Sequence, residues 1–321
     1  MGGEQQGARA RPVMERKSFC EELRSMVSGP VFFDEPMNRH TSMGVGGKAD
    51  ALIFPESAGE LAKLITFLRS AGVPFLPVGN CTNLIVRDGG FRGFLVSLRN
   101  LRGKALRWGD DEAVLDVGAG VPLSEVVGMA VDEALTGMEF CAGIPGSVGG
   151  GLKMNAGAFG REMKDVVKAV ALVNGDGIKS LAREKLNFAY RNLDLPRDAV
   201  IIGAEFALHR ASRERVRARV AEILAIRKSR HPLQYRSAGS VFKNPASVPA
   251  GKLIDEAGLK GTRIGGAMVS DEHGNFIVNT GAATAKDVIA LVELVESRVF
   301  EKTGVRLERE VKIIGEEEGR S

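Results

Sequence analysis

The chain of 321 residues contains few of the residue types that mark several common protein classes. Its three cysteines, Cys20, Cys81 and Cys141, form no CxxC pair, which excludes a disulfide scaffold and favours a reducing compartment. Its four histidines are scattered without the spacing of metal ligands, so we predict no catalytic metal. No apolar run approaches the roughly 18 residues of a membrane-spanning helix. We therefore expect a cytoplasmic protein with no membrane partner.

Aromatic residues are scarce as well, with 15 Phe, 2 Tyr and 1 Trp. A protein that stacks the bases of single-stranded nucleic acid uses more of them. The formal net charge is +4, and the isoelectric point near 9.0 suits an anionic small molecule as well as it suits nucleic acid. A basic nucleic-acid-binding module is the alternative outside the enzymes, but we expect no nucleic-acid partner.

The motifs of the commonest nucleotide-binding folds are incomplete. Residues 118–120 (GAG) follow a predicted strand, but the third glycine of the dinucleotide-binding GxGxxG motif is missing. Neither a GxxxxGK[ST] phosphate loop nor the GxSxG nucleophile elbow of hydrolases is present. A dinucleotide, if bound, is therefore bound by another fold.

Glycine is abundant, with 40 residues, and it gathers in three segments. These are residues 44–47 (GVGG), 79–84 (GNCTNL) and 143–160 (GIPGSVGGGLKMNAGAFG). Residues without side chains let consecutive N–H groups converge on a diphosphate. One such loop is more often a plain turn. Three of them in one chain, two with asparagines beside the glycines, favour a bound dinucleotide.

The order of the predicted elements indicates an α+β protein with three lobes. The first unit has a strand at 49–55, a helix that opens at the capping box of Ser57 and Glu60, and a strand at 73–78. The second unit is expected to contain a strand at 113–118, a helix from Pro122 to a stop at Gly137, a hairpin turn at 174–177 and a strand at 199–209.

The third unit opens with a basic amphipathic helix over 212–230. A longer helix is predicted over 284–303, with Thr284 and Asp287 as a capping box and Gly304 as its stop. A strand is expected at 305–315.

Six segments, in order along the chain, resemble those of the UDP-N-acetylenolpyruvoylglucosamine reductase family, the flavoenzymes of bacterial cell-wall precursor synthesis. The segments are NRHTSMGVGGKAD, PVGNCTNLIV, GIPGSVGGGLKMNAGAFG, YRNLDL, AGSVFKNP and LEREVKIIG. The resemblance implies an oxidoreductase that reduces UDP-N-acetylglucosamine enolpyruvate to UDP-N-acetylmuramate with NADPH, through non-covalently bound FAD. That reaction belongs to peptidoglycan precursor synthesis.

The resemblance also implies the domain architecture. An FAD-binding fold of the vanillyl-alcohol-oxidase (PCMH) type would be followed by a C-terminal α+β substrate domain. The expected divisions are a flexible tail (1–17), the two parts of the FAD-binding domain (18–97 and 98–209), the UDP-substrate domain (210–305) and a C-terminal strand and tail that complete the active site (306–321).

The family motifs assign the cofactor contacts to the glycine-rich segments. The residues expected to bind FAD are Thr41, Gly46, Gly47, Gly79, Asn80, Cys81, Thr82, Asn83, Leu84, Gly143, Ile144, Pro145, Gly146, Ser147, Gly149, Gly150, Asn155, Ala156 and Gly157.

The implied reaction develops negative charge on the substrate carboxylate and adds a proton to C2, so the site needs a cation and a proton donor. The family pattern assigns these roles to Arg191, Ser240 and Glu310. A guanidinium binds a carboxylate at two points. A serine hydroxyl is an effective acid only beside a group that stabilises its alkoxide, and Lys243 is such a neighbour. We expect a raised pKa for Glu310.

Each of these residues also has an ordinary structural interpretation. Arg191 would bond loop carbonyls, Ser240 would occupy a turn and Glu310 would lie on a charged edge strand. On a strand Glu308 and Glu310 share a face, so spacing does not separate them. The family motif favours the glutamate before valine.

Further substrate contacts follow from the resemblance, and we expect a monomer with UDP-N-acetylglucosamine enolpyruvate and NADPH as its partners. The expected contacts are Tyr190, Arg230, Lys243 and Asn244, with Arg227 and Lys228 as alternatives to Arg230 at the diphosphate.

The chain departs from the family pattern at two places. Cys81 stands where the family's loop has glycine, so a left-handed backbone there would be strained. No tyrosine follows Tyr235, so the chain resembles the shorter branch, which lacks a substrate-covering tyrosine loop. An FAD oxidase of another small molecule on the same fold is the alternative, with His40 or Cys141 as a covalent flavin tether.

Overall fold

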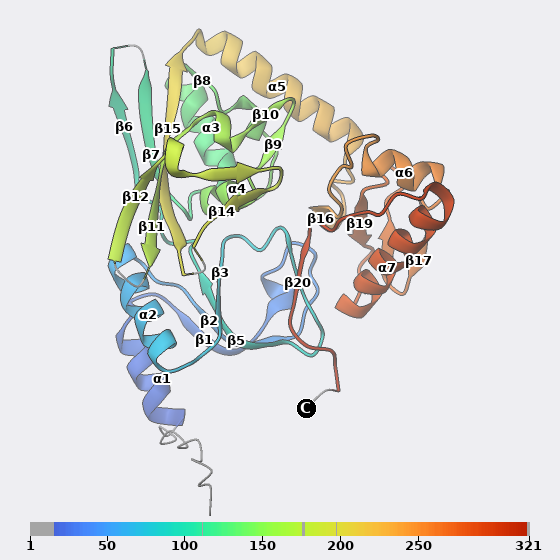
Figure 1. The fold of residues 1–321 in the computed structure, drawn as a ribbon, viewed down its shortest axis with the longest axis horizontal. Coiled ribbons are helices and arrows are strands. Elements are labelled where there is room, and N and C mark those ends of the chain that lie inside the picture. The colour runs from blue at the N-terminus through green and yellow to red at the C-terminus, as the bar shows by residue number, and fades with distance from the viewer. Residues whose placement is uncertain (1–15, 111, 175–176, 197, 320–321) are drawn as a thin grey trace, which may run out of the picture.

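The computed structural model describes residues 16–110, 112–174, 177–196 and 198–319 (Figure 1). Three sheets of four or more strands follow one another along the sequence. In Figure 1 the first lies below, the second at the upper left and the third at the right, with helix α5 crossing above from the second to the third. The mixture of helices and strands confirms the predicted α+β class.

The N-terminal tail predicted for residues 1–17 extends too far along the chain. Helix α1 (Arg16–Ser25) already begins at Arg16, and its Leu23 is fully buried in the largest core cluster. Residues 1–15 lie outside the described residues.

The first sheet has the strand order β1-β2-β5-β3, with β1 antiparallel and the other strands parallel. Its strands and its helix are β1 Val31–Pro36, β2 Lys48–Ile53, β3 Phe75–Val78, β5 Phe91–Ser97 and α2 Ala58–Ser70. The Ser57 hydroxyl accepts the N–H of Glu60, as the capping motif predicts, whereas the Glu60 carboxylate bonds the N–H of Glu56. The glycine-rich loop at 79–83 begins where β3 ends.

The second sheet is antiparallel, with the order β12-β11-β15-β7-β6 and with β8 paired to β15. Its elements are β6 Lys104–Trp108, β7 Ala113–Gly118, β8 Leu135–Thr136, β11 Val167–Asn174, β12 Gly177–Ala182, β15 Val200–Arg210, α3 Leu123–Asp132 and α4 Val148–Lys153. The predicted hairpin is confirmed by the pairing of Asn174 with Gly177, while residues 175–176 of its turn lie outside the described residues.

The predicted end of helix α3 at Gly137 is wrong. The helix ends at Asp132, because Ala134 adopts a left-handed φ of 54° and β8 then pairs with β15. The residue types between Glu133 and Gly137 suit a helix, so the sequence did not reveal that β8 pairs with the distant strand β15.

The third sheet has the order β16-β19-β18-β17. Its strands and helices are β16 Arg236–Ser240, β17 Arg263–Ile264, β18 Ala267–Val269, β19 Phe276–Asn279, α5 Arg213–Arg230, α6 Ala250–Glu256 and α7 Ala285–Thr303. The predicted helices at 212–230 and 284–303 are confirmed, with Ser212 as the N-cap of α5 and Gly304 as the left-handed end of α7.

The N-terminus of α7 is bonded to the first lobe. The predicted capping box is present, since Thr284 and Asp287 each accept the other's N–H. In addition, the Asp88 carboxylate accepts the N–H groups of Ala285 and Lys286 at 3.0 and 2.8 Å. The first-turn donors of α7 are thus satisfied partly by a residue far away in sequence.

The C-terminal segment returns to the first lobe as the red strand near the centre of Figure 1. Strand β20 (Lys312–Ile314) pairs in parallel with β4 (Leu84–Val86). The strand predicted over 305–315 is wrong before Lys312, apart from one bridge between Arg309 and Phe242. The segment crosses from one lobe to another there, so its backbone has no continuous neighbouring strand.

The remaining short elements are η1 Met37–Arg39, η2 Glu139–Cys141, η3 Met163–Asp165, η4 Arg183–Lys185, β9 Gly157–Ala158, β10 Arg161–Glu162, β13 Asn187–Ala189 and β14 Asn192–Asp194. Of these, η1 lies between β1 and β2, and the others lie along the chain between β8 and β15. One core cluster joins the first two sheets, and a second packs Met43 and Ile85 of the first lobe against the third. None of the described helices could span a membrane.

Candidate functional site

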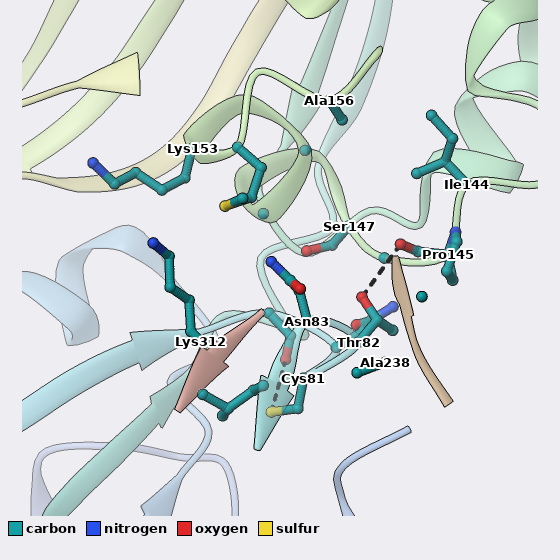
Figure 2. Close-up of a pocket in the computed structure, with 18 of the residues that line it drawn as sticks. Cys81, Thr82, Asn83, Ile144, Pro145, Ser147, Lys153, Ala156, Ala238 and Lys312 are labelled. Atoms are coloured by element: carbon teal, nitrogen blue, oxygen red, sulfur yellow. Dashed lines mark hydrogen bonds between the residues drawn. The ribbon is translucent and has the colours of Figure 1, made fainter. Parts of the chain in front are cut away.

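A cavity of about 1110 Å³ is lined by residues from all three sheets, and Figure 2 shows part of its wall. The loop after β3 and the segment 143–151 form one side of the lining. The end of β16 and the start of β20 supply further residues. The C-terminal return therefore completes a cavity that begins at the glycine-rich loops.

The two glycine-rich loops contact each other at the cavity. The Thr82 hydroxyl donates to the carbonyl of Pro145 at 3.2 Å. A Cβ atom on Gly79 would lie 2.5 Å from the Ser147 hydroxyl oxygen, so a larger residue there would force the Ser147 side chain to move. The Ser147 hydroxyl itself is buried and has no hydrogen-bond partner among the described residues. A polar ligand in the cavity would satisfy it.

Cys81 has the strained backbone that the sequence predicted, with a φ of 52°. Its side chain is buried in the core cluster beneath the loop, beside Val78 and Leu84. Burial raises the pKa of the thiol to about 11, so the side chain is neutral at physiological pH. Its role in the loop is packing.

Most of the predicted FAD contacts line the cavity. They are Gly79, Asn80, Cys81, Thr82, Asn83, Leu84, Gly143, Ile144, Pro145, Gly146, Ser147, Gly149, Gly150, Ala156 and Gly157. The close approach of the two loops and the unpartnered Ser147 hydroxyl suit a ligand that carries a diphosphate, so these residues fit FAD.

Thr41, Gly46 and Gly47 were also predicted to bind FAD, but they do not line the cavity. The Thr41 hydroxyl is buried and donates to the carbonyl of Val45 at 2.8 Å. A Cβ atom on Gly47 would lie 2.2 Å from the carbonyl oxygen of Asp88. This turn is glycine-rich because it packs against the segment after β4, and the geometry does not support a cofactor contact.

Asn155 is likewise absent from the lining, although it lies between residues that are present. Its amide nitrogen donates to Glu162 and to the carbonyl of Ala189, and its amide oxygen accepts the N–H of Lys164. The fully buried side chain thus holds neighbouring loops together.

Two of the predicted catalytic side chains form an ion pair at the cavity. Arg191 lies in the tight turn between β13 and β14, with a left-handed φ of 56°. Its Nε lies 3.0 Å from Oε1 of Glu310, and the two side chains are 18% and 17% exposed. Burial raises the pKa of Glu310, although the charge of Arg191 opposes the shift. The raised pKa confirms the prediction.

Glu308 and Glu310, which the sequence spacing could not separate, have different surroundings in the structure. The side chain of Glu308 is 72% exposed and pairs with Lys243, whereas Glu310 lines the cavity. The backbone also fixes Glu310, since its N–H donates to the carbonyl of Val241 and its carbonyl accepts from the amide of Asn83. Glu310 is therefore held between the loop after β3 and the end of β16.

Ser240, the third predicted catalytic residue, is the last residue of β16 and lines the same cavity. Its neighbour Val241 bonds Glu310, so the two predicted residues are adjacent through the backbone. The Ser240 hydroxyl makes no hydrogen bond within the described part of the chain. It is available to a ligand.

The predicted substrate contacts lie beside the cavity but not in its lining. Lys243 is close enough to act on the charge of Glu310, and its ammonium pairs with Glu308. The N–H of Asn244 donates to the Tyr190 hydroxyl at 3.3 Å, so these two are in contact with each other. Arg230, at the end of α5, does not line the cavity.

Of the three basic residues considered for the diphosphate, only Arg227 lines the cavity, and some further lining residues were not predicted as contacts from the sequence. Arg227 lies one turn before Arg230 on α5 and does line the cavity; burial lowers its pKa, and its Nε has no partner among the described residues. His231 lines it too, and burial lowers its pKa to about 4. Lys153 and Lys312 are further unpredicted cations. For Arg227, helical spacing alone does not say which arginine faces inward.

The two residues considered as covalent flavin tethers are not placed for that role. His40 bonds Glu35 at 2.8 Å, and Cys141 is fully buried; neither lines the cavity. Burial raises the pKa of Cys141 to about 12, so its thiol is unreactive.

The fold and the glycine-lined cavity fit the class of FAD-containing oxidoreductases. Family models agree: one described as an FAD binding domain matches residues 49–180, and one described as the C-terminal domain of UDP-N-acetylenolpyruvoylglucosamine reductase matches residues 231–314. The FAD-binding domain and the C-terminal α+β domain are as expected.

Curated relatives identify the family. The enzyme named UDP-N-acetylenolpyruvoylglucosamine reductase from Syntrophus aciditrophicus is 54% identical over 95% of this chain and 99% of its own length. Its namesake from Caldanaerobacter subterraneus is 44% identical over 93% and 98%. The crystal structure of MurB from Thermus caldophilus superimposes with a TM-score of 0.73 at 36% identity, covering 88% of this chain and 98% of that one. The chain belongs to the UDP-N-acetylenolpyruvoylglucosamine reductase family.

Proposed function

We propose that the chain reduces UDP-N-acetylglucosamine enolpyruvate to UDP-N-acetylmuramate with NADPH, in peptidoglycan precursor synthesis. The loops at 79–84 and 143–151 would hold FAD, which would supply hydride transfer from NADPH to C3 of the enolpyruvyl double bond. C2 takes one proton, so the sum consumes NADPH and a proton and yields NADP⁺ and the saturated ether. The chain's own residues must therefore bind the substrate carboxylate, deliver the proton and exclude water.

Arg191 would bind the substrate carboxylate. A guanidinium offers two parallel donors to a carboxylate, and its charge stabilises the enolate that develops during hydride addition. The ion pair with Glu310 keeps the guanidinium at the cavity, since both side chains are largely buried. Arrival of the carboxylate would draw the guanidinium away from Glu310.

Glu310 would then act in its protonated form. Burial already raises its pKa against the charge of Arg191. When the substrate carboxylate binds Arg191, the charge of Arg191 lowers the pKa of Glu310 less strongly. Glu310 then binds a proton more readily. A neutral carboxyl group donates a hydrogen bond to the developing enolate without adding negative charge.

Ser240 would transfer its hydroxyl proton to C2. The hydroxyl has no partner among the described residues, and Ser240 lines the cavity together with Glu310 and Arg191. The nearby cationic groups of Arg191 and Lys243 would stabilise the alkoxide as the proton leaves. The observation that carries the proposal is this meeting of three residues from separate segments of the chain at one glycine-lined cavity.

The rest of the substrate would bind to the third lobe and the C-terminal segment. On this proposal FAD lies between the parts 18–97 and 98–209, and the sugar nucleotide contacts 210–305 and 306–321. The contacts proposed for it are Tyr190, Arg230, Lys243 and Asn244, with Arg227 added because it lines the cavity. We propose that the chain acts as a monomer. The three free cysteines are compatible with the cytoplasm.

Separate measurement of the two half-reactions tests the role of Ser240. In Ser240→Ala, anaerobic stopped-flow should find flavin reduction by NADPH within about twofold of wild type. Reoxidation by UDP-N-acetylglucosamine enolpyruvate should fall by roughly 100-fold or more, because the proton donor is missing.

Ser237→Ala is the matched control, since Ser237 lies on the same strand and lines the cavity without an assigned role. Equal loss of both half-reactions in Ser240→Ala would contradict the proton-donor role. A reduced wild-type enzyme that this substrate fails to reoxidise would contradict the proposed reaction and favour an oxidase.

A further inference from the structure

Two lysines in the cavity have no part in the reaction described above. Lys153 ends helix α4, and Lys312 begins strand β20. Figure 2 shows their side chains extending from opposite walls to the same side of the cavity, with the loop of Cys81 to Asn83 beside them. The two ammonium groups act on each other, since the charge of Lys312 contributes to lowering the pKa of Lys153.

Neither lysine is neutralised by an ion pair within the described part of the chain. Lys153 donates to the carbonyl of Leu193 at 2.7 Å, and burial is the main cause of its lowered pKa. Asp194 acts on Lys153 from a distance without pairing. The Lys312 ammonium makes no hydrogen bond or ion pair with the described residues. The cavity thus holds two like charges that no ion pair with a described residue neutralises, although Asp194 and Glu310 act on them from a distance.

These two charges lie near the predicted catalytic residues Glu310 and Arg191. Lys312 follows Glu310 by two residues, and its charge is among those that oppose the raised pKa of Glu310. Glu310 in turn pairs with Arg191. A flavin ring that exchanges a hydride beside Arg191 and Glu310 would lie in the electrostatic field of the two lysines. Such a ring becomes more negative when it is reduced. The diphosphate of the cofactor does not need these lysines, because the glycine-rich loops offer it backbone amides.

We propose that Lys153 and Lys312 together stabilise the negative charge that the flavin ring gains on reduction, and so raise its reduction potential. They are positioning and tuning residues that need not contact the substrate. The inference rests on the proposed function, because it requires FAD in this cavity. Charge near the flavin ring is one of the means by which a protein tunes the cofactor.

Sulfite titration of the flavin-bound enzyme tests this inference without any turnover. Sulfite adds to oxidised flavin and leaves negative charge on the ring, so its affinity reports the cationic field. We expect Lys312→Met and Lys153→Met each to bind sulfite about tenfold more weakly, and the double variant more weakly still. A tenfold change in a two-electron equilibrium corresponds to about 30 mV, so the reduction potential should fall by that amount in each variant.

Two control variants accompany the titration. Lys168→Met removes the same charge from β11, outside the cavity, and should leave sulfite affinity unchanged. Lys312→Arg keeps the charge and should retain most of the affinity. Thermal unfolding with flavin bound identifies a methionine variant that has failed to fold, and the matching glutamine variant, Lys153→Gln or Lys312→Gln, then replaces it.

Three results separate the possibilities. Unchanged sulfite affinity and potential in both methionine variants would overturn the inference. Weaker FAD binding by the apoprotein with an unchanged potential would also overturn it, because it would assign the lysines to the diphosphate. A wild-type protein that binds no flavin would contradict the proposed function instead.

Discussion

Cys81 and Arg191 hold a left-handed backbone at the cavity although neither is glycine. This conformation costs about 1–2 kcal/mol for a residue with a Cβ atom. The surroundings keep both in place: the Cys81 side chain packs into the core, and the Arg191 guanidinium pairs with Glu310. The strained turns therefore aim the loop amides and the guanidinium at the same cavity.

The strain at Cys81 predicts an order of stability. Cys81→Val should have a free energy of unfolding about 1–2 kcal/mol lower than that of Cys81→Gly, because a β-branched residue tolerates positive φ poorly and glycine adopts it freely. Urea unfolding of the flavin-bound proteins measures the difference. At Cys141, which is buried without a positive φ, the order should be reversed. The same order at both sites would argue against backbone strain.

The residue types predicted many of the residues that line the cavity, but not which similar residues nearby point away from it. The glycine-rich loops at 79–84 and 143–151 line the cavity, whereas the glycine-rich turn at 44–47 packs against the segment after β4 and does not. Asn83 and Asn155 look alike in sequence. The amide of Asn155 is nevertheless consumed by hydrogen bonds to its own neighbours, and only the tertiary contacts reveal this.

At the scale of the elements, helix α7 depends on a residue outside its own segment. Asp88 bonds the N–H groups of Ala285 and Lys286 and carries negative charge at the helix N-terminus, where the macrodipole favours it. The contact also joins the first lobe to the third. One carboxylate thus caps a helix and connects two parts of the molecule.

Removing this carboxylate should weaken the attachment of α7. We expect Asp88→Ala to lower the free energy of unfolding by about 1–2 kcal/mol, because two N–H groups lose their acceptor. Asp88→Asn, which keeps an oxygen acceptor but loses the charge, should lose about half as much. Urea unfolding gives both values, and a loss below about 0.3 kcal/mol in Asp88→Ala would contradict the capping role.

Elements with local signals were predicted closely, and those fixed by distant partners were not. Ser212 and Thr284 cap their own helices, so the starts of α5 and α7 were correct. The end of α3 and the segment 305–311 depend on β15 and on Val241, which lie far away in sequence. Apolar alternation alone extended the predicted strand through the crossing segment.

For the whole molecule, the decisive feature is that the proposed catalytic side chains share one cavity. Arg191, Ser240 and Glu310 come from different lobes or from the segment between them, and all three line it. The family resemblance predicted this gathering, whereas spacing in the sequence could not. The order of the domains along the chain was inferred in the same way and stays a prediction.

A shared cavity predicts ping-pong kinetics. NADPH and the enolpyruvyl nucleotide would both have to bring their reacting carbon to the same place, so each should exclude the other. Initial rates measured with both substrates varied should give parallel double-reciprocal lines, with inhibition at high substrate concentration. Intersecting lines would show a ternary complex and would contradict the shared pocket.

The strand β20 has a consequence for the order of events on the ribosome. Glu310 and Lys312 are translated after the rest of the predicted catalytic cluster and the glycine-rich loops, yet they complete the cavity wall beside the loop after β3. A nascent chain can thus fold its first two sheets while the pocket is still open on one side. Full enclosure of the prosthetic group must wait until residues 310–314 have emerged from the exit tunnel.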